Sequence, residues 1–331
     1  MYILRLALQG FNPCVPPPGP CVRCGSEALV RWGQRHRRVK DRQCAAATVQ
    51  RYWCKACHRT FSVHPQGLER SPQTTPYQAT LLTLYLLGLS LRKVVLALSL
   101  FAFPTVSFVT VWRDLQRWGQ HFQRPHLQAQ IVGVDTTFVP VRGVSQGIFI
   151  AVTLGDKTLL VQAVGSAEDY QRAFATLHSL GVTVVVSDDD HAFYGPVEAL
   201  GLRQQGCLWH AQRVISRALR KLSLPQREQW QSLITLLWES LKAPPPHPPP
   251  ALVQAQGLPL PAPLRYAVVY ALDLWHRLTL YQRIPELPRT NNLSERAIGR
   301  TKFRARTVRG FKSLPGALNF CSATQYLLAP S

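Results

Sequence analysis

Hydrophobic residues between Thr75 and Phe122 recur at helical spacing, and breaks at Gly88 and Ala102-Phe103-Pro104 divide this segment. The pattern predicts helix, turn and helix, in which the last helix, Ser107 to Trp118, is placed to serve as a DNA-recognition helix. Helical hairpins are also common in purely packing roles, so both interpretations stay open.

From residue 130 the pattern changes to strands with intervening helices. Three successive strands joined by turns are expected over 131–141, 147–153 and 158–164. A helix over about 168–180 leads into a strand that begins at Val182, and a short strand over 203–207 precedes a helix that begins near Trp209. This order predicts an α/β fold with a mixed sheet of the ribonuclease H type.

Within this region a buried strand runs directly into a cluster of carboxylates. The run from Val182 to Val186 shows no alternation and is typical of a strand covered on both faces, and Ser187-Asp188-Asp189-Asp190 follows it. Alone, the cluster is interpreted more readily as a helix cap than as an active site. Asp135 changes that balance, because an acidic residue is unfavourable in mid-strand and such a violation is expected at a functional site. In the ribonuclease H arrangement the first strand neighbours the fourth, so Asp135 and Asp188 are expected to project toward one point.

Two carboxylates in one cleft repel each other and are stable mainly when divalent cations neutralise them. That is two-metal chemistry, which requires a third carboxylate. Glu295 offers one, in the first turns of a helix that Thr290 or Asn291 can cap. A glutamate there would ordinarily only complement the helix dipole, but its cationic surroundings favour a metal ligand beside bound phosphates. The residues expected to hold those phosphates are Arg296, Arg300, Lys302 and Arg304.

Two Cys-x-x-Cys pairs lie near the N-terminus. Cys21, Cys24, Cys54 and Cys57 can supply four thiolates to one structural Zn²⁺, as in a zinc ribbon. Four unrelated thiols are the alternative, and Cys14, Cys44, His36 and His58 are substitute ligands. Between the pairs, basic residues are interspersed with tryptophan and tyrosine, which suits phosphate contacts with aromatic support. The expected contacts include Arg37, Arg38 and Lys40.

Composition points to a polyanionic partner. The chain has 331 residues, with 38 basic against 17 acidic residues and a formal net charge of +21. Self-repulsion of that size favours nucleic acid as the partner. No apolar run is long enough to span a bilayer, so no membrane partner is expected. A reducing cytoplasm is the expected location, with the eight cysteines as metal ligands or free thiols.

A proline-rich segment interrupts the last third of the chain. Ala243 to Pro250, with more prolines to Pro263, is typical of a polyproline-like loop or spacer rather than a core element. The domains expected are a zinc-ribbon region over 1–70, a helix-turn-helix over 71–125 and a catalytic domain over 126–331. The catalytic domain would carry a helical, proline-rich insertion at about 211–285.

Several motifs, in order, resemble bacterial insertion-sequence transposases of the DDE class. They are Gly133-Val134-Asp135-Thr136-Thr137, Val186-Ser187-Asp188, Cys207-Leu208-Trp209-His210, Thr290-Asn291-Asn292-Leu293-Ser294-Glu295-Arg296, Arg309-Gly310-Phe311-Lys312-Ser313 and Gly316-Ala317. Each motif alone is weak, but their order and spacing together are specific, and the resemblance covers most of the chain. It implies a ribonuclease H-like catalytic domain in which Asp135, Asp188 and Glu295 bind two Mg²⁺ or Mn²⁺ ions.

The long separation of Asp188 from Glu295 is similar to that in the mutator-like group, in which a Cys-x-x-His motif follows the second aspartate. Cys207 and His210 match that motif, either as packing and capping residues or as support for the active site or the DNA end. Asp189 and Asp190 depart from the family pattern, and we expect them to cap the following helix while Asp188 binds metal.

The expected function is therefore that of a DNA transposase, which cleaves at the terminal inverted repeats of its element and joins the freed 3′-hydroxyl to target DNA. Synapsis of two ends implies a homo-oligomer on DNA, associated with the bacterial nucleoid. A domesticated or inactive transposase that only binds DNA is the alternative. A ribonuclease H-fold nuclease acting in repair or on RNA hybrids is a third interpretation.

Overall fold

The computed structural model describes residues 7, 10–69, 71–123, 127–308 and 310–328. The chain divides into two compact units. The first contains residues 1–122, 303–309 and 315–331, and the second contains residues 123–302 and 310–314. In the described ranges, every helix is too short or too polar to cross a membrane.

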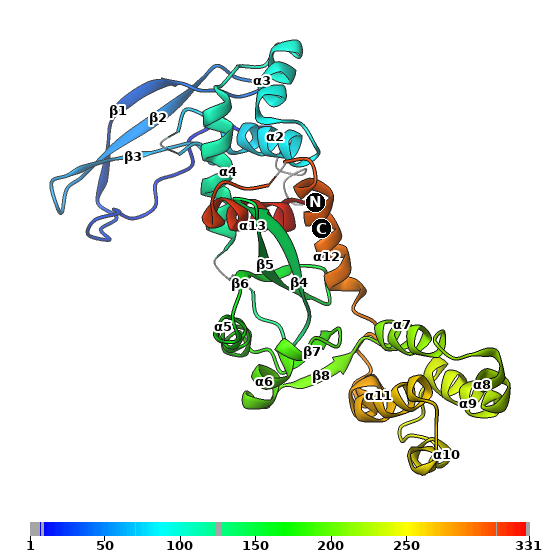
Figure 1. The fold of residues 1–331 in the computed structure, drawn as a ribbon. Coiled ribbons are helices and arrows are strands. Elements are labelled where there is room, and N and C mark those ends of the chain that lie inside the picture. The colour runs from blue at the N-terminus through cyan, green and yellow to red at the C-terminus, as the bar shows by residue number, and fades with distance from the viewer. Residues whose placement is uncertain (1–6, 8–9, 70, 124–126, 309, 329–331) are drawn as a thin grey trace. The chain divides into compact units, whose positions relative to one another are not determined.

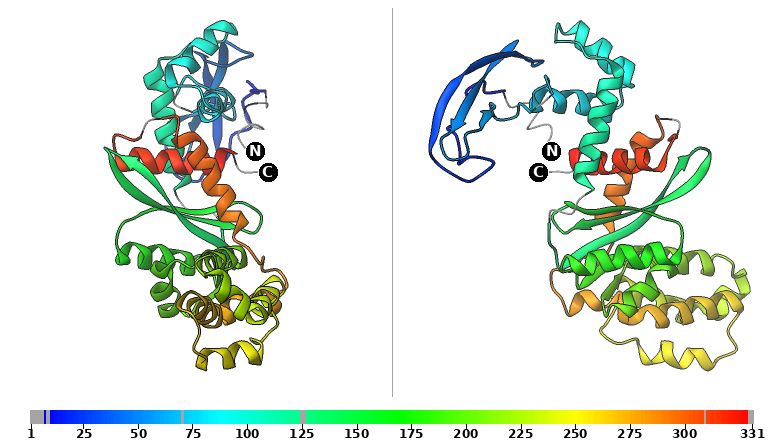
Figure 2. Two further views of the ribbon diagram at one scale, coloured as in Figure 1. Left: turned by 45° about the vertical axis from the view of Figure 1, so that its right-hand side comes forward. Right: turned by 90° about the vertical axis from the view of Figure 1, so that its left-hand side faces the viewer.

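The first unit contains a three-stranded antiparallel sheet (Figure 2). Its strands, in spatial order, are β1 (Leu29–Arg38), β2 (Ala46–Cys54) and β3 (Thr60–Val63). β1 is exposed along most of its length, and the hydrophobic cluster beside the sheet is small. The buried members of that cluster are Phe11, Val39, Ala47 and Leu68. β2 is the buried strand of the sheet, with Val49, Tyr52 and Cys54 at most 6% exposed.

The helices of the first unit are α2 (Thr75–Leu86), α3 (Leu91–Leu100), α4 (Phe108–Phe122) and α13 (Leu314–Leu328). The expected breaks are confirmed: Gly88, with φ of 130°, follows α2, and Ala102, with φ of 54°, follows α3. Thr74 and Ser90 cap α2 and α3, because each hydroxyl accepts a backbone N–H of the first turn. α13 crosses α4 closely, with the rings of Phe122 and Tyr326 stacked 4.1 Å apart.

The second unit is built on a mixed five-stranded sheet (Figure 1). Its strands, in spatial order, are β6 (Thr158–Val164), β5 (Val144–Thr153), β4 (Ile131–Val141), β7 (Val184–Ser187) and β8 (Arg203–Gly206). β4, β5 and β6 are antiparallel, whereas β7 and β8 run parallel to β4. The predicted strands are confirmed, and the first strand does pair with the fourth.

The two faces of this sheet carry different elements. On one face, α5 (Ala167–Ser179) and α6 (His191–Ala199) bury Phe174 and Phe193 against Phe149 and the neighbouring valines of the sheet. On the other face, Val184 and Val186 of β7 pack against a separate cluster from residues 280–287. Burial on both faces explains why β7 reads as an uninterrupted apolar run.

A helical insertion follows β8. It comprises α7 (Leu208–Leu219), α8 (Leu224–Gln229), α9 (Gln231–Lys242), α10 (Pro250–Gln254), η1 (Ala255–Gly257), α11 (Ala262–Leu278) and η2 (Leu280–Gln282). Residues of α7, α9, α10, η1 and α11 share one hydrophobic core centred on α7 and α11, whereas Leu280 of η2 packs with β7. Figure 1 shows them grouped beyond the β8 edge of the sheet.

The first part of the proline-rich segment, residues 243–249, is a loop as predicted, but the part from Pro250 onward is helical and joins this core, which the prediction of a spacer missed. Leu252, Ala255 and Leu260 are buried in the shared cluster. The carbonyl of Pro245 accepts a hydrogen bond of 3.0 Å from the indole N–H of Trp275, a residue of α11. Prolines lack an N–H but keep a carbonyl, and here the partner for that carbonyl comes from α11.

Candidate functional site

Strand register brings Asp135 and Asp188 to the same level of the sheet. Gly133 of β4 pairs with Val186 of the parallel strand β7, and each aspartate lies two residues further along its own chain. Because side chains alternate between the faces of a sheet, both carboxylates emerge on the face opposite α5 and α6. Asp135 is half-buried, and Asp188 directly follows the last residue of β7.

A third carboxylate, Glu295, and the imidazole of His210 lie near Asp188. Glu295 lies in the first turn of α12 (Asn292–Ala305), and His210 lies in the first turn of α7. His210 Nδ1 is 2.8 Å from Asp188 Oδ1, and His210 Nε2 is 3.7 Å from Glu295 Oε1. The imidazole thus links two of the three predicted carboxylates. From the sequence alone, this position of His210 could not be preferred over simple packing and capping.

The charges in the cluster perturb one another. Burial, followed by the nearby charge of Asp188, raises the pKa of Asp135 to about 7. Proximity to the Asp188 carboxylate raises the pKa of His210 to about 10. Lys302 of α12 acts in the opposite direction on Asp135, whose pKa it lowers. Carboxylates that are costly to ionise together are suited to a bound cation, which would remove that cost.

Asn291 fastens the start of α12 to β4. Its buried side-chain amide donates a hydrogen bond of 2.9 Å to the carbonyl of Val134, the residue before Asp135. A Cβ on Gly133 would lie 3.0 Å from Asn291 Oδ1, so the missing side chain of Gly133 makes room for this contact. The side chain of either Thr290 or Asn291 was expected to cap this helix. Its amide instead sets the distance between the strand of Asp135 and the helix of Glu295.

The three consecutive aspartates after β7 have separate surroundings. Asp190 caps α6, since its Oδ1 accepts the N–H of Ala192 at 2.9 Å, as predicted. Asp189 does not cap. Its carboxylate lies near Tyr270 and Arg277 of α11, and after burial it is the next cause that raises the pKa of Tyr270. The predicted capping role of Asp189 is therefore corrected to a contact with the insertion.

The basic residues of α12 fall into two groups. Arg296 and Lys302 are exposed on its surface. Arg300 instead makes a bidentate pair with Asp156 at 2.9 and 3.0 Å. Arg304 is only 2% exposed, lies over the ring of Tyr85, and donates to the carbonyl of Leu89 at 3.0 Å. Arg300 and Arg304 are thus engaged within the protein, whereas Arg296 and Lys302 are accessible to solvent.

The four cysteines of the two Cys-x-x-Cys pairs meet at one point. The sulfur atoms of Cys21, Cys24, Cys54 and Cys57 all lie within 4.8 Å of one another. The Sγ atoms of Cys21 and Cys57 are 3.8 Å apart, and those of Cys24 and Cys54 are 3.6 Å apart. A tetrahedron of thiolates about 2.3 Å from zinc has edges of about 3.8 Å. Hydrogen bonds from the backbone N–H groups of Cys57 and Ala56 lower the pKa of Cys54 to about 6. This four-cysteine cluster can hold a structural zinc.

The basic residues of the first sheet are partly engaged within the protein. Arg37 donates to the carbonyl of Glu69 at 2.5 Å, and Lys40 donates to that of Thr105 at 2.6 Å. Arg38 is exposed. An ammonium carries three donors, and the contact with Thr105 occupies one of those of Lys40.

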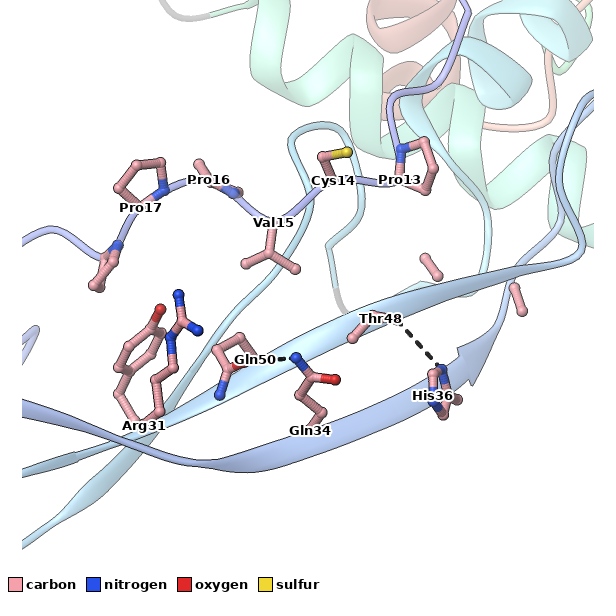
Figure 3. Close-up of a pocket in the computed structure, with 14 residues that line it drawn as sticks. Pro13, Cys14, Val15, Pro16, Pro17, Arg31, Gln34, His36, Thr48 and Gln50 are labelled. Carbon is pink, nitrogen blue, oxygen red and sulfur yellow. Dashed lines mark hydrogen bonds between the residues drawn. The ribbon is translucent and has the colours of Figure 1, made fainter.

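A pocket of about 720 Å³ lies between residues 13–18 and one face of β1 and β2 (Figure 3). Figure 3 shows Pro13 to Pro17 along one side and polar side chains of the two strands along the other. Gln34 donates to Gln50 at 3.0 Å, and His36 lies 3.3 Å from the hydroxyl of Thr48. Amide, imidazole and guanidinium groups side by side are the chemistry that recognises nucleobase edges.

Comparisons with known proteins add no family. Neither the protein-family models nor the curated proteins gave a match. Among solved structures, the chain is similar to one in a cryo-EM structure of the simian T-cell lymphotropic virus intasome in complex with PP2A regulatory subunit B56 gamma. The identity is 15% and the TM-score 0.19, over 53% of this chain and 63% of that chain. The match thus spans less than two thirds of that chain, and at this TM-score it carries no argument about fold or function.

Proposed function

We propose that this protein is a DNA transposase of the DDE class with a ribonuclease H-like catalytic domain. The observation that carries the proposal is the convergence of Asp135, Asp188 and Glu295, from three separate segments, around His210. The strand order β6-β5-β4-β7-β8, with only the last two strands parallel to β4, supports the ribonuclease H-like assignment.

Asp135, Asp188 and Glu295 would hold two Mg²⁺ or Mn²⁺ ions. Carboxylate oxygens are the ligands that these ions prefer, and a cation beside Asp135 would favour its ionised form, against the burial and the Asp188 charge that raise its pKa. When bound, such ions activate an attacking oxygen and stabilise a leaving oxygen at phosphorus. Arg296 and Lys302 would hold the phosphates beside the cluster, and Asn291 would keep Glu295 at a fixed distance from Asp135.

The reaction needs no covalent bond to the protein. Water cleaves a phosphodiester at the end of the element and leaves a 3′-hydroxyl and a 5′-phosphate. The 3′-hydroxyl then attacks a phosphodiester of target DNA and releases a 3′-hydroxyl there. The zinc-ribbon sheet and the helices α2 to α4 would recognise the terminal repeats, and two copies of the chain would bring two ends together.

The test uses the full-length protein and a plasmid carrying the DNA that flanks its own coding sequence. With Mg²⁺ or Mn²⁺, wild type is expected to nick or cut at the element ends, and Asp188→Asn and Glu295→Gln to lose more than about 100-fold of that rate. Asp273→Asn is the matched control, because Asp273 is an exposed carboxylate of α11. Equal cleavage by wild type and Asp188→Asn would contradict the proposal.

The second candidate function is sequence-specific DNA binding without cleavage. It draws on the net charge of +21 and the exposed Arg296 and Lys302, which suit DNA phosphates whether or not the carboxylates hold metal ions. Retarded migration of the end fragments with no cleavage in either metal would favour this candidate over the transposase.

A further inference from the structure

Three potential metal ligands lie together beside the proposed catalytic carboxylates. One ligand atom from each of Asp188, Cys207 and His210 lies within 4.8 Å of the other two. Cys207 precedes the first residue of α7, and His210 lies three residues later, so both side chains lie on one side of its first turn. Asp188 reaches them from the end of β7. Cys207 is 3% exposed, so the cluster is closed off from solvent on the sulfur side.

The contact between His210 and Asp188 is close without being a well-formed hydrogen bond. Their Nδ1 and Oδ1 atoms are 2.8 Å apart, and both atoms are buried, yet neither has a hydrogen-bond partner of acceptable geometry. Two atoms that lie side by side and face a common point are arranged as ligands of one ion. Buried polar atoms without a partner are rare, and an ion is one of their recognised explanations.

The far side of the imidazole fits the same arrangement. His210 Nε2 lies 3.7 Å from Glu295 Oε1. A histidine that binds metal through one nitrogen commonly donates its other N–H to a carboxylate, which fixes the orientation of the ring. Glu295 occupies the position of that carboxylate.

We propose that Asp188, Cys207 and His210 form a second zinc site, distinct from the four-cysteine cluster and from the Mg²⁺ ions. A thiolate, an imidazole and a carboxylate select a borderline-soft ion such as Zn²⁺ or Co²⁺, whereas Mg²⁺ prefers oxygen ligands alone. Three protein ligands leave one position of a tetrahedron open. Zinc binding here needs no assumption about catalysis.

Its consequence for catalysis rests on the proposed function. Asp188 belongs to both sites, so an ion bound to Cys207 and His210 withdraws this carboxylate from the Mg²⁺ ions. Zinc is then an inhibitor of Mg²⁺-dependent cleavage, and a chelator that prefers zinc relieves the inhibition.

The site is tested by metal content and by the absorption of the Co²⁺-substituted full-length chain. Wild type is expected to bind about two zinc ions, and Cys207→Ser and His210→Gln about one each. Cys24→Ser is expected to lose the other ion. Cys14→Ser, which replaces an exposed cysteine, is the control and keeps both. In Co²⁺-loaded protein, Cys207→Ser removes a weak one-thiolate charge-transfer band and leaves the strong band of the four-cysteine cluster.

One zinc per wild-type chain, or two in both Cys207→Ser and His210→Gln, would overturn the second site. Circular dichroism shows whether a variant that loses metal has kept its fold, and two independent ligand variants guard against one that has not. A separate experiment measures the rate of Mg²⁺-dependent cleavage as zinc is added, and each protein is compared with its own rate without zinc. Zinc is expected to inhibit cleavage by wild type and to have less effect on Cys207→Ser. If wild type cleaves nothing, the proposed function fails, and the metal count still decides the site.

Discussion

Gly133 and Asn291 form a pair in which one residue is small because the other is present. A methyl group on Gly133 would meet Asn291 Oδ1 at 3.0 Å, while the Asn291 amide holds the carbonyl of Val134. Glycine here is required by the close approach of a helix start to a strand, and its backbone has no unusual dihedral angle. The contact joins two motifs that the sequence could only list separately.

We expect Asn291→Ala to lower the free energy of unfolding by about 1–3 kcal/mol, because the buried carbonyl of Val134 loses its donor. Gly133→Ala is also expected to destabilise, through the contact with Asn291. The double variant should lose less than the sum of the two, since alanine at 291 removes the atom that the new methyl meets. Urea denaturation of all four proteins gives the coupling. Strict additivity would show that the two residues act independently.

At the level of single residues, the sequence predicted what depends on local pattern. Asp135 was singled out because it interrupts a strand, and the pairing of β4 with β7 brings it to the level of Asp188. Asp190 was predicted as a cap, and its partner Ala192 is only two residues away. The surroundings of Asp189 were not predicted, since Tyr270 and Arg277 belong to a helix far along the chain, and no local pattern shows that contact.

The arginines of α12 differ in their surroundings: one forms an internal ion pair, and another is exposed to solvent. Arg300 and Asp156 join α12 to the turn between β5 and β6, with only 15% and 9% of their side chains exposed. Arg296, one turn earlier, is exposed. A periodic run of basic residues predicts a phosphate-binding helix, but it cannot show which arginine finds an internal carboxylate.

We therefore predict that Arg300→Ala lowers stability, whereas Arg296→Ala weakens DNA binding. Arg300→Ala leaves the Asp156 carboxylate buried without a partner and is expected to cost about 3–5 kcal/mol of stability. Arg296→Ala is expected to change stability by less than about 0.5 kcal/mol and to weaken DNA binding. Chemical denaturation and fluorescence anisotropy with labelled duplex DNA measure the two effects. If Arg300→Ala is as stable as Arg296→Ala, the pair with Asp156 has no structural role.

The crossing of α4 and α13 gives a second prediction for helices. A Cβ on Gly119 would lie 2.3 Å from the backbone carbonyl of Asn319, so the two helices touch backbone to backbone. Gly119→Ala must push them apart and is expected to cost about 1–3 kcal/mol in thermal or urea unfolding. Gly299→Ala is the control, because the added methyl meets nothing within 4 Å. An unchanged Gly119→Ala protein would mean that the helices do not cross as described.

Elements were predicted where their period was clear. Strands β4 to β8 and helices α2 to α4 follow from the apolar pattern, because each buries one face or both in its own unit. The role of the proline-rich segment could not be predicted, because burial of Leu252 and Leu260 depends on α11 and not on any period of their own.

Charge is the property of the molecule as a whole that bears most directly on function. With a net charge of +21, DNA affinity is expected to fall steeply with salt, by about 10³–10⁵ between about 50 and 200 mM if six to ten phosphates are contacted. Arg38→Ala should lower the slope of log affinity against log salt by about 1. Anisotropy titrations at several salt concentrations measure this slope. A slope near zero would exclude DNA as the polyanion that this charge serves.

The contact of α13 with α4 also sets an order of events during synthesis. α4 leaves the ribosome early, whereas its partner residues Asn319 and Tyr326 are translated only after the entire second unit. Until then the α13-facing side of α4 is uncovered, so a nascent chain can finish the sheet around Asp135 before it finishes the helices proposed to bind DNA. Messages interrupted before residue 315 would yield chains with the carboxylates in place but without this helical partner.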